Sequence, residues 1–284
     1  MKTVRAWLDE GARALPGDEA RRETALLLRH VLGVSEAWLV AHADDSIDPA
    51  HAAAFRDLVA RRAHGEPVAY LTGTRGFHAV ALRVTPDVLI PRPETELLVD
   101  CALQRIPRDA GCAVADLGTG SGAIALAIAK ARPRAKLVAT DASRAALEVA
   151  RANAARLAIG NVEFCQGDWC APLGDASFDV IVSNPPYIAE GDPHLHEGDL
   201  RFEPAAALAS GDDGLDAIRV IIRDAHAHLH EGGWLMFEHG FDQGPAVREL
   251  LAAHGYVDVF TERDLEDRER VSGGVHHDVP TNGG

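Results

Sequence analysis

Apolar residues recur at spacings of three and four positions through the first part of the chain, up to about residue 74. This spacing places them on one face of a helix, so we expect short helices that bury these faces against one another. Gly33 can end the second helix, and Pro49 can begin the third. The apolar positions are Val4, Trp7, Leu8, Leu26, Leu27, Leu28, Val31, Leu32, Phe55, Leu58 and Val59. The pattern predicts a helical domain over 1–74, which either recognises a partner or only caps the rest of the chain.

The pattern changes to strict alternation between residues 75 and 92. Val80, Leu82 and Val84 alternate with other residues, and such alternation is typical of a strand with one buried face. We therefore expect a β-hairpin over 75–92 that links two domains. Pro93 then stands at a position where a helix can begin.

From residue 93 onward, short apolar runs alternate with helical patterns. Strands are expected at 113–117, 136–140, 162–165, 180–183, 234–238, 256–261 and 270–275, and helices at 123–131, 144–157, 215–229 and 244–254. Strands that alternate with helices form βαβ units, in which the strands lie parallel. The pattern predicts an α/β domain over 93–284, built on a doubly wound, mostly parallel sheet of seven strands.

Composition narrows the possible partners and compartments. Asp and Glu (43) outnumber Lys and Arg (28), and the net charge of −15 disfavours nucleic acid, which is bound mainly by cationic side chains. The N-terminus lacks the apolar segment of a signal peptide, and the apolar run at 123–129 is far shorter than the ~20 residues of a membrane span. We expect a cytoplasmic protein without membrane contact. The cysteines lack a C-x-x-C spacing and are expected to be reduced core residues: Cys101, Cys112, Cys165 and Cys170.

A glycine-rich sequence, DLGTGSG at 116–122, follows the first strand of the expected sheet. Glycines at a turn from strand to helix let the backbone pass close to a ligand. Asp141 ends the next strand, where an acidic residue commonly accepts hydrogen bonds from a ribose. Both features predict a nucleoside cofactor. The residues themselves leave NAD open, because Gly118, Gly120 and Ala123 also satisfy a relaxed dinucleotide pattern.

The sequence Asn184-Pro185-Pro186-Tyr187 ends the fourth strand of the expected sheet. Prolines cannot continue a strand, and ligands bind beyond the carboxyl ends of the strands in open α/β sheets. The side-chain oxygen of Asn184 and the main-chain oxygen of Pro185 can accept both hydrogens of a planar NH₂ group. Pro186 can stiffen the turn, and the Tyr187 ring can pack on the planar group. Such a turn can hold an amide nitrogen in line with an electrophilic carbon ~3–3.5 Å away.

These two motifs together resemble those of class I S-adenosylmethionine methyltransferases. In that family the glycine loop passes the methionine end of the cofactor, the acidic residue binds the ribose, and a further pair contacts the adenine. The matching positions here are Gly118, Thr119, Gly120, Ser121, Gly122, Asp141, Asp168, Trp169 and Asn184. The Asn-Pro-Pro-Tyr motif resembles that of enzymes that methylate planar nitrogens. The resemblance implies S-adenosylmethionine as the cofactor, S-adenosylhomocysteine as a product, and no metal.

Further motifs resemble those of the peptide chain release factor glutamine methyltransferases, the HemK/PrmC family. They occur in the family's order: VLIPRPETE at 88–96, DLGTGSGAIALAIA at 116–129, NPPYI at 184–188, GDLRFEPAAAL at 198–208 and FEHG at 237–240. The resemblance implies methylation of the glutamine side-chain nitrogen in the Gly-Gly-Gln motif of class I release factors. Asn184, Pro185 and Tyr187 would then be catalytic, Pro186 would border the substrate, and domain 1–74 would recognise the release factor.

Other substrates and activities stay open. Ribosomal-protein glutamine methyltransferases share the Asn-Pro-Pro-Tyr motif but usually lack the Pro-Glu-Thr-Glu sequence found here at 93–96. Adenine methyltransferases share it too, but they usually add a basic region that reads DNA. An NAD-dependent oxidoreductase and a release-factor-binding module without activity are the remaining alternatives. One departure from the family pattern lies at 264–270, where the sequence is DLEDRER.

Histidines gather in three places without the spacing of a metal site. Their members are His194 and His196 beside Asp192 and Glu197, then His226, His228 and His230, and finally His276 and His277. Spacings of two on the expected helix spread the second group around its axis. We expect solvated surface histidines, no metal, and a loop over 192–204 that contacts the substrate protein. We also expect a monomer.

Overall fold

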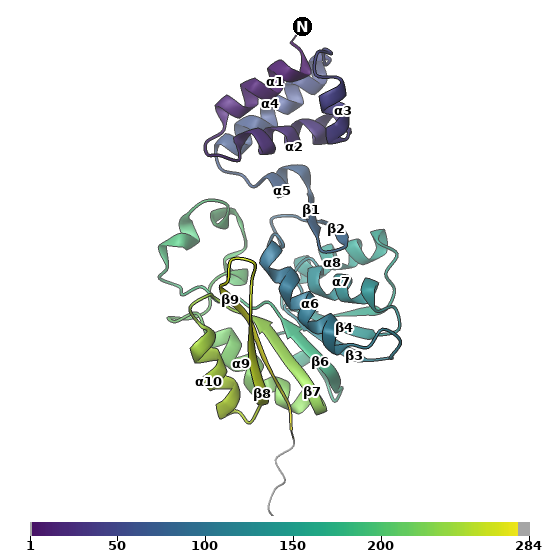
Figure 1. Ribbon diagram of the computed structural model, residues 1–284, viewed down its shortest axis with the longest axis vertical. Helices are drawn as coiled ribbons and strands as arrows, with labels where there is room; N and C mark the ends of the chain where they lie inside the picture. The colour runs from purple at the N-terminus through teal and green to yellow at the C-terminus, as the bar shows by residue number, and fades with distance from the viewer. Residues whose placement is uncertain (1, 278–284) are drawn as a thin grey trace, which may run out of the picture. The chain divides into compact units, whose positions relative to one another are not determined.

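The computed structural model describes residues 2–277 and divides the chain into two compact units, one up to Thr74 and one from Arg75 onward. The expected domains 1–74 and 93–284 also take in residue 1 and residues 278–284, which lie outside the described part. The helices of the first unit are α1 (Val4–Ala14), α2 (Ala20–Leu32), α3 (Glu36–Ala41), α4 (Pro49–Ala63) and α5 (Val68–Thr72) (Figure 1).

Polar residues begin the helices of the first unit. The side chains of Thr3, Ser35 and Asp48 accept hydrogen bonds from the first backbone amides of α1, α3 and α4, which would otherwise lack partners. Gly33, with φ 66°, ends α2, as predicted. Pro49 also begins a helix as predicted, but this helix is the fourth and not the third, because the short helix α3 was not expected. The core of the unit contains Val4, Trp7, Leu15, Leu27, Leu28, Leu39, Phe55 and Val59. Leu26, whose side chain was predicted to face the core, is instead 36% exposed.

A two-stranded hairpin follows the helical unit. Its strands are β1 (Thr74–Phe77) and β2 (Val80–Arg83). Side chains of β2 alternate between buried and exposed, as the pattern predicts. The buried Asn153 side chain accepts a hydrogen bond from the Arg83 backbone N–H at 2.7 Å and donates one to the Arg83 carbonyl at 2.9 Å. The hairpin is therefore held by a side chain of helix α8 (Arg144–Arg156).

A seven-stranded sheet forms the centre of the second unit and confirms the predicted fold class. The strands, in the order β5-β4-β3-β6-β7-β9-β8, are β3 (Ala113–Leu117), β4 (Lys136–Asp141), β5 (Val162–Gln166), β6 (Phe178–Ser183), β7 (Leu229–Glu238), β8 (Val257–Arg263) and β9 (Glu269–Val275). Strands β3 to β7 pair in parallel, whereas β9 runs antiparallel to both of its neighbours. The sheet is thus mostly parallel.

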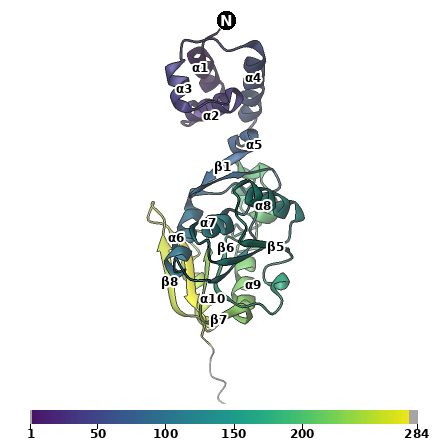
Figure 2. The ribbon, with the colours of Figure 1, turned by 90° about the vertical axis from the view of Figure 1, so that its right-hand side faces the viewer.

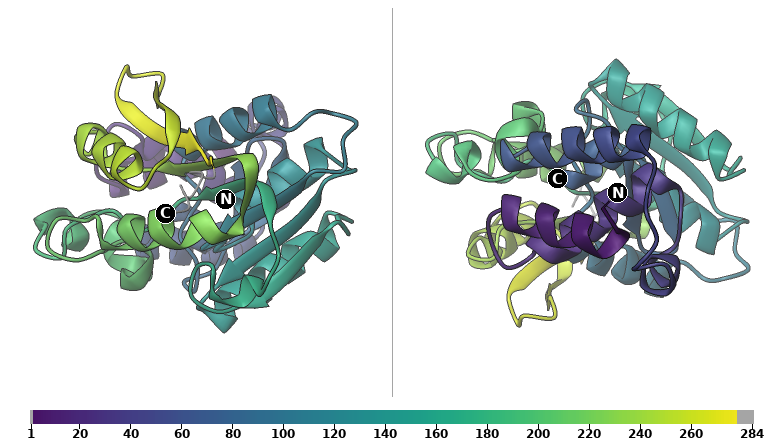
Figure 3. Two further views of the ribbon diagram at one scale, coloured as in Figure 1. Left: turned by 90° about the horizontal axis from the view of Figure 1, so that it is seen from below. Right: turned by 90° about the horizontal axis from the view of Figure 1, so that it is seen from above.

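Helices cover both faces of this sheet (Figures 2 and 3). The helices α6 (Glu96–Arg105) and α7 (Ala123–Ala131) pack with α8 in one apolar core, and α9 (Asp216–Ala225) and α10 (Gly244–Ala253) pack in the other. Shorter 3-10 helices are η1 (Pro93–Thr95), η2 (Ala171–Leu173), η3 (Pro193–His196), η4 (Leu200–Phe202), η5 (Ala205–Ala207) and η6 (His226–His228). Within residues 2–277, no helix has the length and apolar character needed to cross a membrane.

Strands β4 and β5 lie on one side of β3, and the chain then crosses to the other side of β3 to form β6. Strands β3 and β6 are adjacent and parallel, and Leu117 pairs with Ser183 at their carboxyl ends. The Ser183 hydroxyl donates a hydrogen bond to the Leu117 carbonyl at 2.7 Å. The loops that follow the two strands therefore leave side by side, at the kind of topological switch point where α/β sheets bind ligands.

The helix predicted at 215–229 is too long, and the strand predicted at 234–238 is too short. Helix α9 ends at Ala225, and β7 already begins at Leu229. Leu229 fits the helical spacing because it lies four positions after Ala225, yet it is buried as a strand residue that pairs with Phe178. His230 consequently lies in β7 and not on a helix.

Two further predictions about exposure are wrong. His276, expected on the surface, is 3% exposed, and its ring meets that of His226 edge to face. Of the four free cysteines, Cys112 and Cys165 are only half-buried, whereas Cys101 and Cys170 are buried as predicted. Both errors arise because exposure depends on which strands and helices become neighbours.

Candidate active site

The glycine loop after β3 needs backbone conformations that favour glycine. Gly118, Gly120 and Gly122 have φ of 72°, 55° and 84°, in the left-handed region. The backbone N–H groups of Gly118 and Thr119 both donate to the carbonyl of Thr140 on β4 at 2.9 Å. A Cβ atom at Gly118 would lie 3.0 Å from the ring of Trp169. The loop is thus folded tightly between β4 and the Trp169 ring.

Asp116, the last residue but one of β3, lies fully buried beneath this loop. Its Oδ2 accepts hydrogen bonds from the Thr119 hydroxyl at 2.6 Å and from the Ala125 N–H at 3.1 Å. Burial raises its pKa to about 6 despite these two hydrogen bonds. Among the described residues, its Oδ1 has no hydrogen-bond partner, which is costly for a buried carboxylate. The orphaned oxygen suits a cationic or N–H donor brought by a ligand. Asp116 is the first residue of the glycine-rich motif, which predicted no role for it.

Asp141 ends β4 and holds two loops by its carboxylate. Oδ2 accepts a hydrogen bond from the Gly120 N–H at 2.8 Å, and Oδ1 accepts one from the Ser143 N–H at 2.8 Å. Burial raises the pKa of Asp141, while these hydrogen bonds act in the opposite direction. A carboxylate has about four lone-pair positions, so each oxygen can still accept from a ribose hydroxyl.

Trp169 and Asp168 follow β5 and complete the group of predicted cofactor residues. Trp169 has a left-handed φ of 45°, and its carbonyl accepts a hydrogen bond from the Thr140 hydroxyl at 2.9 Å. Its ring is half-buried and lies against Gly118, whereas Asp168 is exposed. The structure therefore brings Gly118, Asp141 and Trp169 together around the carboxyl ends of β3 and β4.

The Asn-Pro-Pro-Tyr turn leaves β6 beside the glycine loop. Asn184 is half-buried, and its Nδ2 donates a hydrogen bond to the Thr95 hydroxyl oxygen at 3.1 Å. Pro185 is buried and Pro186 is half-buried. The Tyr187 carbonyl accepts a hydrogen bond from Gln243 Nε2 at 3.0 Å. The turn is thus held from both sides, and Nδ2 is the end of the Asn184 side chain that bonds to the fold.

Tyr187 forms a hydrogen bond with a carboxylate that is not among the predicted site residues. Its phenol donates a hydrogen bond to Oε1 of Glu238 at 2.9 Å, and Glu238 is only 1% exposed at the end of β7. Burial raises the pKa of both groups, and the proximity of Glu238 raises that of Tyr187 further. Phe237 pairs with Ser183, so Glu238, the last residue of β7, lies at the same level of the sheet as Asn184, which directly follows β6.

Thr95 was also missed as a site residue, although its sequence neighbours marked the family resemblance. It ends η1, is 3% exposed, and its hydroxyl oxygen accepts the hydrogen bond from the Asn184 side chain. It also lowers the pKa of Glu238. A signal was present for Glu238, since polar residues at the carboxyl ends of adjacent parallel strands meet at one edge of the sheet. No comparable signal existed for Thr95, whose approach to β6 depends on the path of the chain.

The loop over 192–208 is attached to the same edge by an ion pair. Arg92 donates to Oε1 of Glu203 at 2.7 Å, and the Glu203 side chain is fully buried. Burial raises the pKa of Glu203 to about 6, although Arg92 favours its ionised form. Within the described residues, the nearby acids and histidines form no group that could hold a metal ion. His194 instead hydrogen-bonds to Asp192 at 2.7 Å on the surface.

The atypical sequence at 264–270 forms a closed turn between β8 and β9. Asp264 Oδ1 accepts hydrogen bonds from the N–H groups of Glu266 and Arg268 at 3.0 Å, and its Oδ2 accepts from Arg270 at 3.3 Å. Arg270 lowers the pKa of both Glu238 and Tyr187 by its positive charge, so it lies near them. This segment therefore contributes a cation to the edge of the site.

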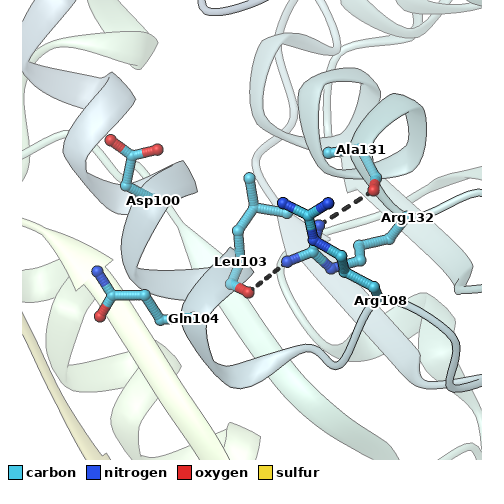
Figure 4. Close-up of a pocket in the computed structure, with 6 residues that line it drawn as sticks. All are labelled: Asp100, Leu103, Gln104, Arg108, Ala131 and Arg132. Atoms are coloured by element: carbon cyan, nitrogen blue, oxygen red, sulfur yellow. Dashed lines mark hydrogen bonds between the residues drawn. The ribbon is translucent and has the colours of Figure 1, made fainter.

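A hollow of about 560 Å³ lies elsewhere on the second unit, beside α6 and α7 (Figure 4). Its lining residues are Asp100, Leu103, Gln104, Arg108, Ala131 and Arg132. The Arg132 guanidinium donates to the carbonyls of Leu103 at 2.6 Å and Ala131 at 3.0 Å, so it holds the chain together there. None of the predicted site residues lines this hollow.

Comparison with known proteins finds matches to both parts of the chain. Residues 94–208 match the family model of the methyltransferase small domain, and residues 6–73 match that of the PrmC N-terminal domain. The release factor glutamine methyltransferase of Xylella fastidiosa (strain Temecula1) is 54% identical over 89% of this chain and 92% of its own length. That of Escherichia coli (strain K12) is 44% identical over 95% of this chain and 98% of its own length.

A solved structure shares the fold at low identity. An rRNA methyltransferase from T. thermophilus, in complex with AdoMet and guanosine, has a TM-score of 0.54 and 20% identity, covering 72% of this chain and 50% of that one. At this identity the likeness extends to the fold alone. The two relatives above, by contrast, match nearly the whole chain at high identity. The chain therefore belongs to the family of release factor glutamine methyltransferases.

Proposed function

We propose that this protein transfers a methyl group from S-adenosylmethionine to the side-chain amide nitrogen of the glutamine in the Gly-Gly-Gln motif of class I release factors. The pairing of Leu117 with Ser183 carries the proposal. Because of this pairing, the glycine loop and the Asn-Pro-Pro-Tyr turn leave adjacent strands at the same edge of the sheet. A cofactor on the first loop and an amide on the second would then be neighbours.

The residues around the glycine loop suit S-adenosylmethionine, which supplies an electrophilic methyl group when bound. The orphaned Oδ1 of Asp116 and the left-handed glycines would accommodate the methionine end, directly or through water. The carboxylate of Asp141 would accept hydrogen bonds from the ribose, and Asp168 and Trp169 would border the adenine. Thr119 and Ser121 would complete this cofactor site, and Asn184 would border it on the side of the substrate.

The turn after β6 would hold the substrate amide. Its nitrogen is a weak nucleophile, because its lone pair is delocalised into the carbonyl. Asn184 Oδ1 and the Pro185 carbonyl would accept its two hydrogens, Pro186 would keep that carbonyl in place, and the Tyr187 ring would pack on the amide plane. The fixed orientation aligns the nitrogen for displacement at the methyl carbon.

The reaction forms one bond and breaks one. With S-adenosylmethionine bound, the amide nitrogen would bond to the methyl carbon as the carbon–sulfur bond breaks with its electrons going to sulfur, and S-adenosylhomocysteine would leave. The nitrogen then loses one proton, which passes to water, because the methylated cation is strongly acidic. This sequence calls for no metal.

The assignments of partner and compartment are part of the same proposal. We assign residues 1–74 to recognition of the release factor, residues 75–92 to the linking hairpin, and residues 93–284 to methyl transfer. Release factors act at the ribosome, so we place the enzyme in the cytoplasm. We propose that it acts as a monomer without binding DNA or a membrane, which sedimentation of the enzyme alone and with release factor would test.

A labelling experiment tests the proposed function. Purified release factor is incubated with the enzyme and S-adenosylmethionine carrying a labelled methyl group, and the product is mapped by peptide mass spectrometry. We expect one methyl group on the glutamine of the Gly-Gly-Gln motif. Parallel reactions contain ribosomal protein or DNA in place of release factor. Label on either of these, with none on release factor, would establish an alternative substrate and refute the proposal. A thermal shift with NAD but none with S-adenosylmethionine would favour the oxidoreductase instead.

A further inference from the structure

The Asn184 side chain has two ends of nearly the same shape and opposite hydrogen-bonding character. Its Oδ1 accepts hydrogen bonds, and its Nδ2 donates them. Only Oδ1 can accept a hydrogen from the substrate NH₂ group under the proposed function. If the side chain rotated by half a turn, Nδ2 would face the substrate, and two donors would then point at each other. Substrate binding therefore needs a neighbour that distinguishes the two ends of Asn184.

We propose that Thr95 is this positioning residue, holding Nδ2 of Asn184 so that Oδ1 is left for the substrate amide. The Thr95 hydroxyl oxygen lies 3.1 Å from Nδ2, although the two residues are 89 positions apart in the chain. Thr95 is 3% exposed, so water does not compete freely for this contact. The inference rests on the proposed function, because it assigns the Asn184 oxygen to the substrate.

A hydroxyl group alone would not distinguish the two ends, because it can both donate and accept. The geometry decides between these two roles. The Thr95 hydroxyl oxygen lies within hydrogen-bond distance of Nδ2 of Asn184, which can only donate, so the hydroxyl acts there as the acceptor. Thr95 also lowers the pKa of the buried Glu238 carboxylate, which favours a hydroxyl hydrogen directed away from Asn184.

Tyr187 directs its own hydrogen toward the same carboxylate. Its phenol donates to Oε1 of Glu238, and within residues 2–277 Oε2 of Glu238 has no hydrogen-bond partner. The amide of Asn184 and the phenol of Tyr187 therefore donate to two different acceptors, Thr95 and Glu238, and the turn is fixed at both of its ends.

Two substitutions at Thr95 test the proposal. Thr95→Val keeps the shape of the side chain but removes the hydroxyl, whereas Thr95→Ser keeps the hydroxyl. We expect Thr95→Val to lower kcat/KM for release factor by about tenfold to a hundredfold, since a hydrogen bond that orients a buried group is lost. Thr95→Ser should stay within about threefold of the unaltered enzyme. The dissociation constant of S-adenosylhomocysteine, measured by calorimetry, should be unchanged in both variants.

Thr261→Val provides a matched control. Thr261 is half-buried on β8, and its hydroxyl bonds to Arg248 and Ser272 at 2.8 Å, away from the turn after β6. This variant loses a structural hydroxyl and should keep its turnover. Turnover by Thr95→Val equal to that of the control would overturn the proposal. A parallel loss of product affinity in Thr95→Val would also overturn it, because the role would then be structural.

The effect of Thr95→Val in an Asn184→Asp enzyme tests whether Thr95 acts by orienting Asn184. An aspartate carboxylate has an oxygen at both ends, so it needs no neighbour to choose between them. Asn184→Asp should therefore keep measurable turnover, and adding Thr95→Val to it should cost less than about threefold. An equal cost of Thr95→Val in both backgrounds would contradict the proposal, as would an Asn184→Asp enzyme without turnover. Failure of the unaltered enzyme to methylate release factor would instead refute the proposed function itself.

Discussion

The phenolic oxygen of Tyr187 lies 2.9 Å from Oε1 of Glu238, across two adjacent strand ends and 51 positions of sequence. The contact holds the tyrosine ring at the turn after β6, where we place the substrate amide. It also gives the buried Glu238 carboxylate one of its few hydrogen-bond donors. One hydrogen bond thus links the shape of the proposed substrate site to the stability of the sheet edge.

Tyr187→Phe separates these two contributions. It keeps the ring but removes a donor from a buried carboxylate, so we expect the free energy of unfolding to fall by about 1–3 kcal/mol. Some methyl transfer should remain because the ring face is kept. Thermal or urea unfolding measures the first effect. Tyr256→Phe is the control, since its phenol donates to the neutral Ile222 carbonyl at 3.0 Å and should cost less. Equal losses in the two variants would show that the charge of Glu238 is unimportant.

Asn184→Ala should abolish methyl transfer while leaving cofactor affinity within about threefold, because the amide loses one of its two acceptors. Turnover with release factor and calorimetry with S-adenosylhomocysteine measure the two quantities. Asn161→Ala is a suitable control: its amide donates to the Ala135 carbonyl at 3.0 Å, so the variant should lose stability but not turnover at equal folded concentration. Full turnover by Asn184→Ala would rule out the proposed role of Asn184.

Asp141→Asn should weaken cofactor binding by about tenfold to a hundredfold, because a charged acceptor for ribose hydroxyls becomes neutral and one oxygen becomes a donor. Calorimetric titration with S-adenosylhomocysteine measures the change. Asp179→Asn makes the same substitution at the amino end of the sheet, where Asp179 accepts from the Ala113 N–H at 2.8 Å. That variant should bind the cofactor normally. Unchanged affinity in Asp141→Asn would exclude the ribose assignment.

Glu203 should make stability fall as pH rises through the range from about 4.5 to 6. Its pKa is raised from 4.5 to about 6 in the folded protein, chiefly by burial, so in this range the folded state binds more protons than the unfolded state. The shift of roughly 1.5 pKa units corresponds to about 2 kcal/mol of stability, present below pH 4.5 and lost above pH 6.

Comparison with Glu203→Gln isolates this contribution, because the variant lacks the titrating group. Asp116, whose pKa is also raised to about 6, contributes equally to both proteins. The free energy of unfolding of the unaltered protein, minus that of Glu203→Gln, should decrease by about 2 kcal/mol between pH 4.5 and pH 7. A difference that stays constant or increases across this range would contradict the assignment.

Local patterns along the chain determined the fold class and most of the site. All seven strands were predicted. The central strands β3 and β6 were the clearest, because burial on both faces of a parallel sheet demands short apolar runs. The glycine loop and the turn at Asn184 were found for the same reason, since each follows directly from a strand. Leu229 was placed wrongly because the same spacing fits both a helix and the start of β7.

Only the tertiary structure decided which side chains complete the site. Thr95 meets Asn184 across 89 positions, and Arg92 meets Glu203 across 111. Neither contact has a periodic signal, because each depends on how the segment before α6 and the loop over 192–208 return to the sheet edge. The spacing of apolar residues thus determines whether a segment forms a helix or a strand. The packing of the whole domain determines which distant polar side chains come into contact at the sheet edge.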